Sequence, residues 1–368
     1  MSDPLQRPTP EYTDWARENR LYEIRREAEK KGRVEGTGIH PAGAPFPVAS
    51  PQTGYYGVPL LKEPPWTWQI PPYFFAGGAA GSAAVIGMVA RWIGHDRELA
   101  RDCRYLAAVG AAISSGLLVS DLGRPARFLS MMRVFKKQSP MSVGAWTLAV
   151  FNTFSAGAAF AEMLNRRYNS LPIRVIGNVS ESVSALAGIP FSNYTGVLIG
   201  ASVIPIWNEN VSTLPIHFGM SGLNAAVSML ELMGHFNPGL NRLGMGASAV
   251  ETLEGLNIEI HTKPVLEPLK RGKNGWMTRL GGVLSGPVPL ALRVAAAFAG
   301  NRRARKLRRV AAASSIAGSM LTRIAWVHAG HISAKNWRLP LEIQEPRSAS
   351  RPRQAMEEEN PPQVAVRQ

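Results

Sequence analysis

Asp121 stands out in the sequence because it lies between two long apolar stretches. Residues 105–120 before it carry no charge, and a second apolar stretch covers residues 141–161. The segment DLGRPARFLSMMRVFKKQSPMSVGAW begins with this single acid and also holds three arginines and two lysines. A carboxyl group at the end of an apolar helix is partly desolvated, and such a group can accept and release protons. Asp121 is therefore a candidate catalytic acid or base.

A structural role for the same carboxyl group is the alternative. Arg124 and Arg127 follow within two turns of chain and would favour the ionised form of the acid. In this interpretation Asp121 pairs with Arg124 and fixes the turn before Pro125. The two roles do not exclude each other.

A second group of titratable residues lies inside later apolar stretches. His217, Asn224 and Glu231 are spaced by seven residues, which places them roughly on one face of a helix. Glu251 and Glu254 share a face of the next helix in the same way. Such a line could carry protons, or it could hold helices together by buried hydrogen bonds. Arg323 is expected to neutralise one of these acids.

Metal and haem chemistry have little support in the sequence. Cys103 is the only cysteine, so the chain has neither an internal disulfide nor a centre with several thiolate ligands. A haem b would need two axial histidines on facing helices. The candidates His217 and His328 lie near opposite ends of their helices, so we expect no haem and no metal. Signatures of hydrolases, P-loops and dinucleotide-binding turns are also absent.

These residues require helices long enough to cross a membrane. The chain has 368 residues, 45% of them hydrophobic, which alone would suit a soluble protein. The distribution says otherwise, because the middle of the chain consists of apolar blocks close to the roughly 20 residues that span a bilayer. The sequence predicts an all-α polytopic membrane protein with about eight spans: Pro72–Trp92, Arg104–Ser120, Ser142–Glu162, Phe191–Trp207, Thr213–Met233, Leu243–His261, Gly282–Gly300 and Leu307–Gly330.

Charge and small residues add detail to this picture. The net charge of +15 comes mostly from basic residues between the apolar blocks, which favours anionic membrane lipid over nucleic acid as partner. Gly77 and Gly81 lie in a run of Gly, Ala and Ser that would allow close helix packing. We expect a polar N-terminal arm over residues 1–70, a membrane domain over 71–331, and a polar, disordered tail over 332–368.

Several motifs, in the same order along the chain, resemble the membrane subunits of the NrfD/polysulfide reductase family. They are the Asp121 loop quoted above, YYGVPLLKEPPWTWQIPPYFFAGGAAGSA, NYTGVLIGASVIPIWNEN, LPIHFGMSGLNAAVSMLEL, LSGPVPLALRV and GSMLTRIAWVHAGHISAKN, and together they cover about residues 54–336. The resemblance implies a multi-pass subunit of the inner (cytoplasmic) membrane that exchanges electrons and protons between menaquinone or ubiquinone and a partner. The implied partner is an iron–sulfur, ferredoxin-like subunit, often joined to a molybdopterin oxidoreductase.

The resemblance also suggests where a quinone would bind. Tyr73 begins the first span, and an even number of spans places it on the same membrane face as Asp121. We therefore expect Tyr73, Asp121 and Arg124 at the quinone site, and His217, Glu231, Glu251 and Glu254 along a proton route. A secondary transporter, a haem b membrane anchor and a purely structural anchor are the alternatives that the residues leave open.

Overall fold

The computed structural model describes residues 61–122, 128 and 131–336, together with Asn19, Tyr22, Glu23 and Arg26. The expectations for the N-terminal arm, for the C-terminal tail and for Arg124 lie outside these residues. The described part of the chain is built from helices and contains no strand. The helices are α2 (Ile70–Trp92), α3 (Arg97–Asp121), α5 (Pro140–Tyr168), α6 (Leu171–Gly200), α7 (Pro205–Glu209), α8 (Leu214–Leu232), α9 (Pro238–Ile260), α10 (Glu267–Lys270), α11 (Gly272–Ser285), α12 (Pro287–Ala297) and α13 (Asn301–Lys335).

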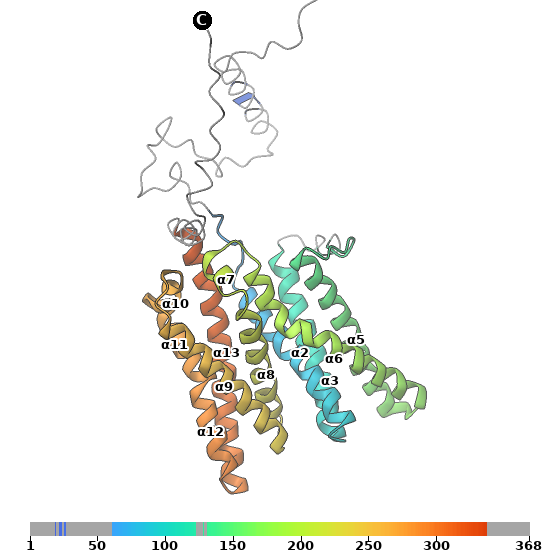
Figure 1. The fold of residues 1–368 in the computed structure, drawn as a ribbon. Helices are drawn as coiled ribbons and strands as arrows, with labels where there is room; N and C mark the ends of the chain where they lie inside the picture. Colours follow the sequence, from blue (N-terminus) through green and yellow to red (C-terminus); the bar gives the residue numbers. More distant parts are fainter. Residues whose placement is uncertain are drawn as a thin grey trace, which may run out of the picture. The chain divides into compact units, whose positions relative to one another are not determined.

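The long helices lie side by side and form two groups of four (Figure 1). The first group contains α2, α3, α5 and α6; the second contains α8, α9, the pair α11–α12, and α13. Contacts of α8 with α2 and α6 join the two groups. We call the end of the bundle that carries Thr67, Asp121 and Lys335 the terminal end. Consecutive long helices alternate in direction, so α8 and α13 are antiparallel.

The central position of α2 follows from its small residues. Glycines allow the backbone of α2 to lie directly against α6 and α8. A Cβ added to Gly81 would lie 2.6 Å from the carbonyl oxygen of Gly188 in α6. In the same way, Gly222 of α8 approaches Gly78 so closely that an added Cβ would lie 2.8 Å from its carbonyl. The prediction that the Gly/Ala/Ser run packs helices together is confirmed.

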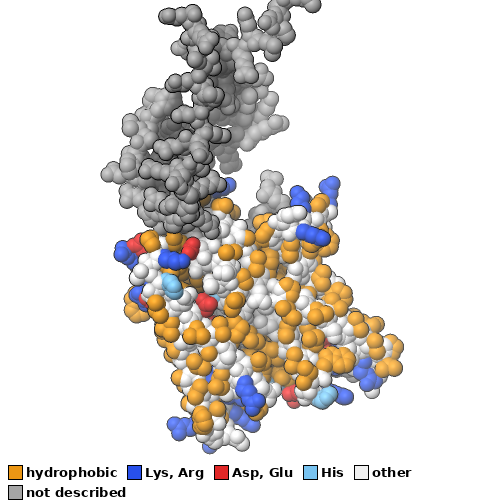
Figure 2. All heavy atoms as spheres, viewed as in Figure 1, with side chains coloured by type: hydrophobic (Ala, Val, Ile, Leu, Met, Phe, Trp, Pro, Cys, Tyr) orange, Lys and Arg blue, Asp and Glu red, His pale blue; other side chains and the backbone are white. Residues whose placement is uncertain are grey.

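A membrane is the environment that suits this surface. By length and composition, five helical segments of the described chain could each cross a bilayer: Ile70–Trp92, Arg97–Asp121, Pro140–Tyr168, Gly272–Ala297 and Asn301–Lys335. Hydrophobic side chains cover the flanks of the bundle, and lysines and arginines gather toward its two ends (Figure 2). These features confirm the all-α polytopic membrane fold. The count of eight spans is not confirmed, since α6, α8 and α9 carry buried polar residues that lower their mean hydropathy.

Two of the expected spans have different bounds in the structure. The fourth was expected at Phe191–Trp207, but α6 runs from Leu171 to Gly200 and a separate short helix, α7, holds Trp207. Pro190 lies inside α6, which is tolerated because neighbouring groups in a bundle can satisfy the freed carbonyl. The seventh is a broken helix, α11–α12, with its break at Gly286.

Candidate functional site

Asp121 anchors the segment that precedes the first long helix. Asp121 is the last residue of α3. Its Oδ1 accepts hydrogen bonds from the Thr67 backbone N–H at 3.2 Å and from the Thr67 hydroxyl at 2.6 Å. Acids are unfavourable at helix C-termini, and these two donors compensate for that placement. Tyr73 lies one helical turn into α2. It is therefore at the same end of the bundle as Asp121.

The segment over residues 61–69 also contacts α13, through Glu63. Glu63 accepts from His331 at 3.1 Å and lies 3.3 Å from the Lys335 ammonium group. The hydrogen bonds from His331 and Lys335 lower the pKa of Glu63 from its ordinary value. The segment therefore crosses from α3 to α13 over the terminal end.

An aromatic cluster fills the space beneath this segment. Trp66 stacks on Trp207 with ring centroids 5.0 Å apart and meets Phe74 edge-on at 6.1 Å. Phe74 in turn lies 5.4 Å from the ring of Tyr73 and 5.9 Å from Phe218. Tyr73 is buried in this cluster.

His217 lies at the inner side of the aromatic cluster with its polar atoms unused. Its ring is 6.2 Å from Trp326 and 5.6 Å from Phe218, and the side chain is buried. Neither ring nitrogen has a hydrogen-bond partner among the described protein groups, and the indole Nε1 of Trp326 has none either. Buried polar atoms are normally paired, so three unpaired ones in neighbouring rings indicate a place for a polar ligand or water.

Arg323 lies one step deeper in the bundle. Its Nη1 donates to the Ser221 hydroxyl at 2.7 Å and to the Ser319 carbonyl at 3.0 Å, and its Nη2 donates to the Phe218 carbonyl at 3.2 Å. The Ser221 hydroxyl also donates to the Ser319 hydroxyl at 2.9 Å. Arg323 was expected to neutralise a buried acid. Serine and backbone oxygens take its hydrogen bonds, and its positive charge acts on the Glu251 carboxyl group without a direct ion pair.

Glu251 and Asn224 continue the polar line toward the middle of α8 and α9. Both are fully enclosed, and Asn224 donates to the Ser285 carbonyl at 2.9 Å and lies 3.5 Å from the Ser248 hydroxyl. Ser285, Ser221 and Asn224 lie close enough to influence the Glu251 carboxyl group. None of them reaches it with hydrogen-bonding geometry, so both carboxylate oxygens are without a partner in the described structure.

Glu231 forms the far end of this line as part of an ion cluster. Its Oε1 accepts from Arg293 Nη1 at 2.7 Å and from Arg308 Nε at 2.8 Å, and all three residues are buried. Arg293 also donates to the Ser228 hydroxyl at 3.2 Å. Two cations hold the same carboxylate oxygen, so Glu231 has a structural role in addition to any transport role.

Three of the four residues expected along a proton route, His217, Glu231 and Glu251, are buried in the second helix group, and the route itself stays a prediction. Half-buried Glu254 makes no hydrogen bond or ion pair within the described residues. The partners Arg293, Arg308, Ser221 and Ser319 were not predicted, because their spacing on other helices gives no signal in a single sequence.

Sequence reasoning also missed a buried ion cluster in the first helix group. Arg104 donates to Glu162 and to Glu181 at 2.7 Å each, and to the Asn178 amide oxygen at 2.9 Å. Arg91 reaches the same Glu181 oxygen at 2.7 Å. The available signal was the acid of GNVSESVSAL, which the sequence-based bounds left outside any span. This cluster lies at the end of the bundle opposite to Asp121.

His217 and His328, the candidate haem ligands, lie toward the same end of the bundle, contrary to expectation. His217 is near the start of α8 and His328 near the end of α13, and these two helices are antiparallel. Their contacts differ, since His217 meets Trp326 while His328 pairs with the Asn274 amide oxygen at 3.3 Å. Absence of haem from this subunit stays a prediction.

The arrangement suits proton transfer coupled to a reaction at the terminal end. Its buried polar groups are His217, the serines around Arg323, Glu251 and Glu231. Buried ionisable residues in membrane helices are costly and typically mark substrate or proton paths.

A comparison with protein families identifies the family of the chain. A model described as polysulphide reductase, NrfD, matches residues 60–258. The chain belongs to the NrfD family.

The matched NrfD region covers the helices from α2 through most of α9. It contains Tyr73, Asp121, His217, Glu231 and Glu251, and it confirms the family resemblance seen in the sequence motifs. Helices α11 to α13 lie beyond the match, although the motif resemblance extends to about residue 336. NrfD proteins are membrane subunits of polysulphide-reductase-like complexes. At this level of detail, the chain is a quinone-interacting membrane subunit. No curated protein matches the chain.

Proposed function

We propose that the protein is the quinone-reactive membrane subunit of a respiratory oxidoreductase complex in the cytoplasmic membrane. It would pass electrons between the quinone pool and an iron–sulfur partner, itself joined in some complexes to a molybdopterin subunit. The NrfD match over residues 60–258 carries this proposal. The buried polar line from His217 supports it, because quinone chemistry requires proton transfer as well as electron transfer.

The proposed reaction fixes what the protein groups must do. Oxidation of a quinol yields the quinone, two protons and two electrons, and the electrons reduce two one-electron acceptors in the partner. The quinone head group would lie at the terminal end, near Tyr73, Asp121 and His217. An unpaired His217 nitrogen can accept a proton from the quinol hydroxyl, and the reverse transfer serves quinone reduction.

The surroundings of His217 disfavour its protonated form, so the imidazole would keep that proton only briefly. The Arg323 guanidinium lies beside Phe218, the residue after His217 in α8, with its Cζ 5.4 Å from the centroid of that ring. A neighbouring fixed cation disfavours a second positive charge on imidazole. The Ser221 and Ser319 hydroxyls, 2.9 Å apart, offer the next exchangeable protons on the way to Glu251. Asp121 is a second candidate acceptor at the end of α3.

The test uses the complex purified from membranes with its partner subunits. Anaerobic addition of a short-tailed quinol should reduce the partner's iron–sulfur clusters, which electron paramagnetic resonance detects directly. Dithionite provides the measure of full reduction. Clusters that respond to dithionite but neither accept electrons from quinol nor donate them to quinone would overturn the proposal.

A further inference from the structure

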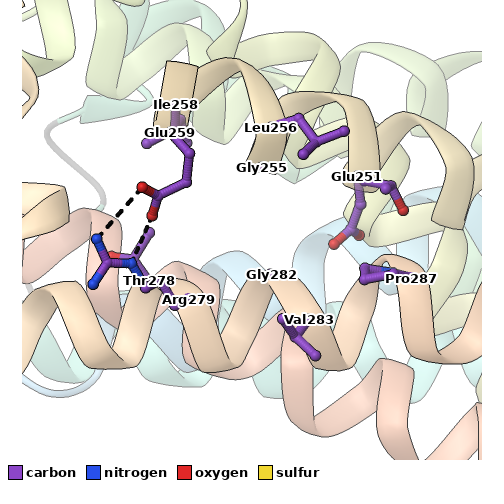
Figure 3. A pocket seen from close by; sticks show the side chains of 11 residues that line it. Glu251, Gly255, Leu256, Ile258, Glu259, Thr278, Arg279, Gly282, Val283 and Pro287 are labelled. Atoms are coloured by element: carbon purple, nitrogen blue, oxygen red, sulfur yellow. Dashed lines mark hydrogen bonds and ion pairs between the residues drawn. The ribbon is translucent and has the colours of Figure 1, made fainter. Parts of the chain in front are cut away.

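A cavity of about 170 Å³ lies between α9 and the broken helix α11–α12. It is separate from the aromatic cluster around His217, and of its lining residues the proposed reaction uses only Glu251, as part of the proton route. Glu251 lies at one end, and Glu259 and Arg279 lie at the other (Figure 3). Eight residues of helix separate the two glutamates, a distance of about 12 Å along the axis. Its other walls are mainly apolar: Gly255, Leu256, Ile258, Thr278, Gly282, Val283 and Pro287.

The two ends of the cavity differ in chemistry. At the outer end, Arg279 Nε donates to Glu259 at 2.7 Å, so these exposed charges satisfy each other. At the inner end, the Glu251 side chain extends from α9 toward α11–α12 (Figure 3), is 2% exposed, and has no hydrogen-bond partner for either oxygen. The unsatisfied acceptor is therefore at the deep end of an apolar space.

The helix break at Gly286 shapes the deep end without satisfying Glu251. A Cβ at Gly286 would lie 2.8 Å from the Thr252 hydroxyl, so only glycine lets α9 come this close. The carbonyls near the break are used elsewhere: Leu284 accepts from Ser314 at 2.7 Å and Ser285 accepts from Asn224 at 2.9 Å. Irregular backbone at membrane depth is tolerated where it is buried in protein or lines a cavity.

The size of the cavity limits what it can hold. An apolar cavity of roughly 150 Å³ is large enough for one benzene ring. A bare hydrocarbon would leave the Glu251 oxygens unpaired, and a charged head group would be desolvated against apolar walls. A metal cation requires several oxygen ligands, whereas the deep end supplies one carboxylate and the Thr252 hydroxyl, which already donates to the Ser248 carbonyl at 2.7 Å, and the Glu259 carboxylate at the outer end is held by Arg279.

We propose that this cavity binds an aromatic ring that carries a hydroxyl group, the chemistry shared by phenols and hydroquinones. The hydroxyl donates to Glu251, and the ring lies between Gly255 and Leu256 of α9 and Gly282 and Val283 of α11. Leu256 and Val283 are 52% and 47% exposed on the flank of the bundle, so a ring can enter from the lipid. Helix α11 lies outside the NrfD match, which ends at residue 258.

The glycines of this region provide matched blocking and control variants. An added Cβ would meet no atom within 4 Å at Gly255, Gly282 or Gly246. Gly255 and Gly282 line the cavity, whereas Gly246 lies on α9 away from it. Gly282→Leu and Gly255→Leu therefore fill the space, and Gly246→Leu makes the same change on a surface without a cavity. Glu251→Leu removes the acceptor at similar size.

The test measures ligand binding by the purified full-length protein in lipid nanodiscs, with fluorine NMR of 4-fluorophenol and of 4-fluoroanisole, which lacks the hydroxyl. We expect saturable binding about tenfold tighter for the phenol, loss of that binding in Gly282→Leu and Gly255→Leu, and wild-type binding in Gly246→Leu. Glu251→Leu should remove the preference for the phenol. Equal binding of both probes, or equal behaviour of the blocking and control variants, would overturn the proposal.

Competition identifies the source of the ring. Displacement by 2,3-dimethoxy-5-methylhydroquinone supports a hydroquinone of the membrane pool, and displacement by monophenols alone supports the phenolic site with another source. Displacement by phospholipid without any preference for the hydroxyl would show an acyl-chain groove and contradict the proposal. The measurement involves no electron transfer, so its outcome is independent of the quinol assay for the proposed function.

Discussion

Thr67 and Asp121, 54 residues apart in the chain, share two hydrogen bonds that tie the first long helix to the end of the second. The same carboxyl group is a candidate proton acceptor for quinol oxidation. The two roles can be separated, because asparagine keeps an oxygen that accepts from Thr67 but cannot take up a proton.

We predict that Asp121→Asn leaves the protein in the membrane and slows quinol-dependent cluster reduction by about 100-fold, within the range for loss of a general base. Thr67→Val removes the hydroxyl donor and keeps the carboxyl group, so its effect on turnover should be several-fold at most. Rates measured with the purified complex across pH would check both variants. Equal rates in the two variants would assign Asp121 a purely structural role.

We predict a similar loss of turnover for His217→Phe, about 100-fold, because its two unpaired nitrogens are removed while the aromatic packing with Trp326 and Phe218 is kept. His261→Gln is the matched control, since His261 is an exposed histidine at the terminal end. Thermal unfolding of His217→Phe should be unchanged or improved because a buried unpaired polar group is lost. Wild-type turnover in this variant would exclude His217 from the proton path.

The buried cluster around Glu181 leads to a prediction about stability. Glu181→Gln leaves Arg91 and Arg104 without their shared carboxylate, and breaking a buried ion pair costs about 3–5 kcal/mol. We expect a large fall in the thermal midpoint of the purified protein and poor accumulation in membranes. Glu98→Gln, which changes a carboxyl group with a side chain 74% exposed, should leave the midpoint within about a degree. A stable Glu181→Gln protein would contradict the structural role.

Sequence patterns predicted the helices best where apolar character is continuous. The bounds of α2 and the end of α3 at Asp121 agree with expectation to within a few residues, because long uncharged stretches have one stable form in lipid. The beginning of α6 was missed since Arg174 and Glu181 made it look like a loop. In the structure Glu181 is neutralised by arginines from two other helices, and no local pattern can reveal that compensation.

The sequence predicted which residues belong to the candidate site, but it did not predict which residues they contact. Periodicity placed His217, Asn224 and Glu231 on one face, and all three are buried in α8. Their surroundings depend on which helices meet that face. The hydrogen-bond partners of Arg323 could not be predicted for this reason, because α13 presents Arg308 to Glu231 and places Arg323 among the oxygens of Ser221, Ser319 and Phe218. Tertiary packing, which a single sequence does not encode locally, decides these pairs.

The last prediction concerns the surface that the iron–sulfur partner covers. Electrons move efficiently only between nearby centres, so a quinone site near Tyr73 and Asp121 requires the partner at the terminal end. Residues 132–139 precede α5 at this end, and Lys136 and Lys137 among them are exposed. Exposed charges act over about a Debye length of 8 Å at physiological salt and mainly steer and orient a partner.

We therefore expect that Lys136→Glu combined with Lys137→Glu weakens assembly with the partner about tenfold at low salt, and by less as salt rises, while membrane insertion is unchanged. The matched control is Arg305→Glu with Lys306→Glu, two exposed or half-exposed cations at the opposite end of the bundle. Co-purification of the partner's clusters with the tagged subunit at several salt concentrations measures the effect. Photo-cross-linkers at Lys137 and at Lys306 provide a second readout, and the partner should be captured from Lys137. Capture from Lys306 alone would place the partner, and with it the electron-transferring quinone site, on the other side of the membrane.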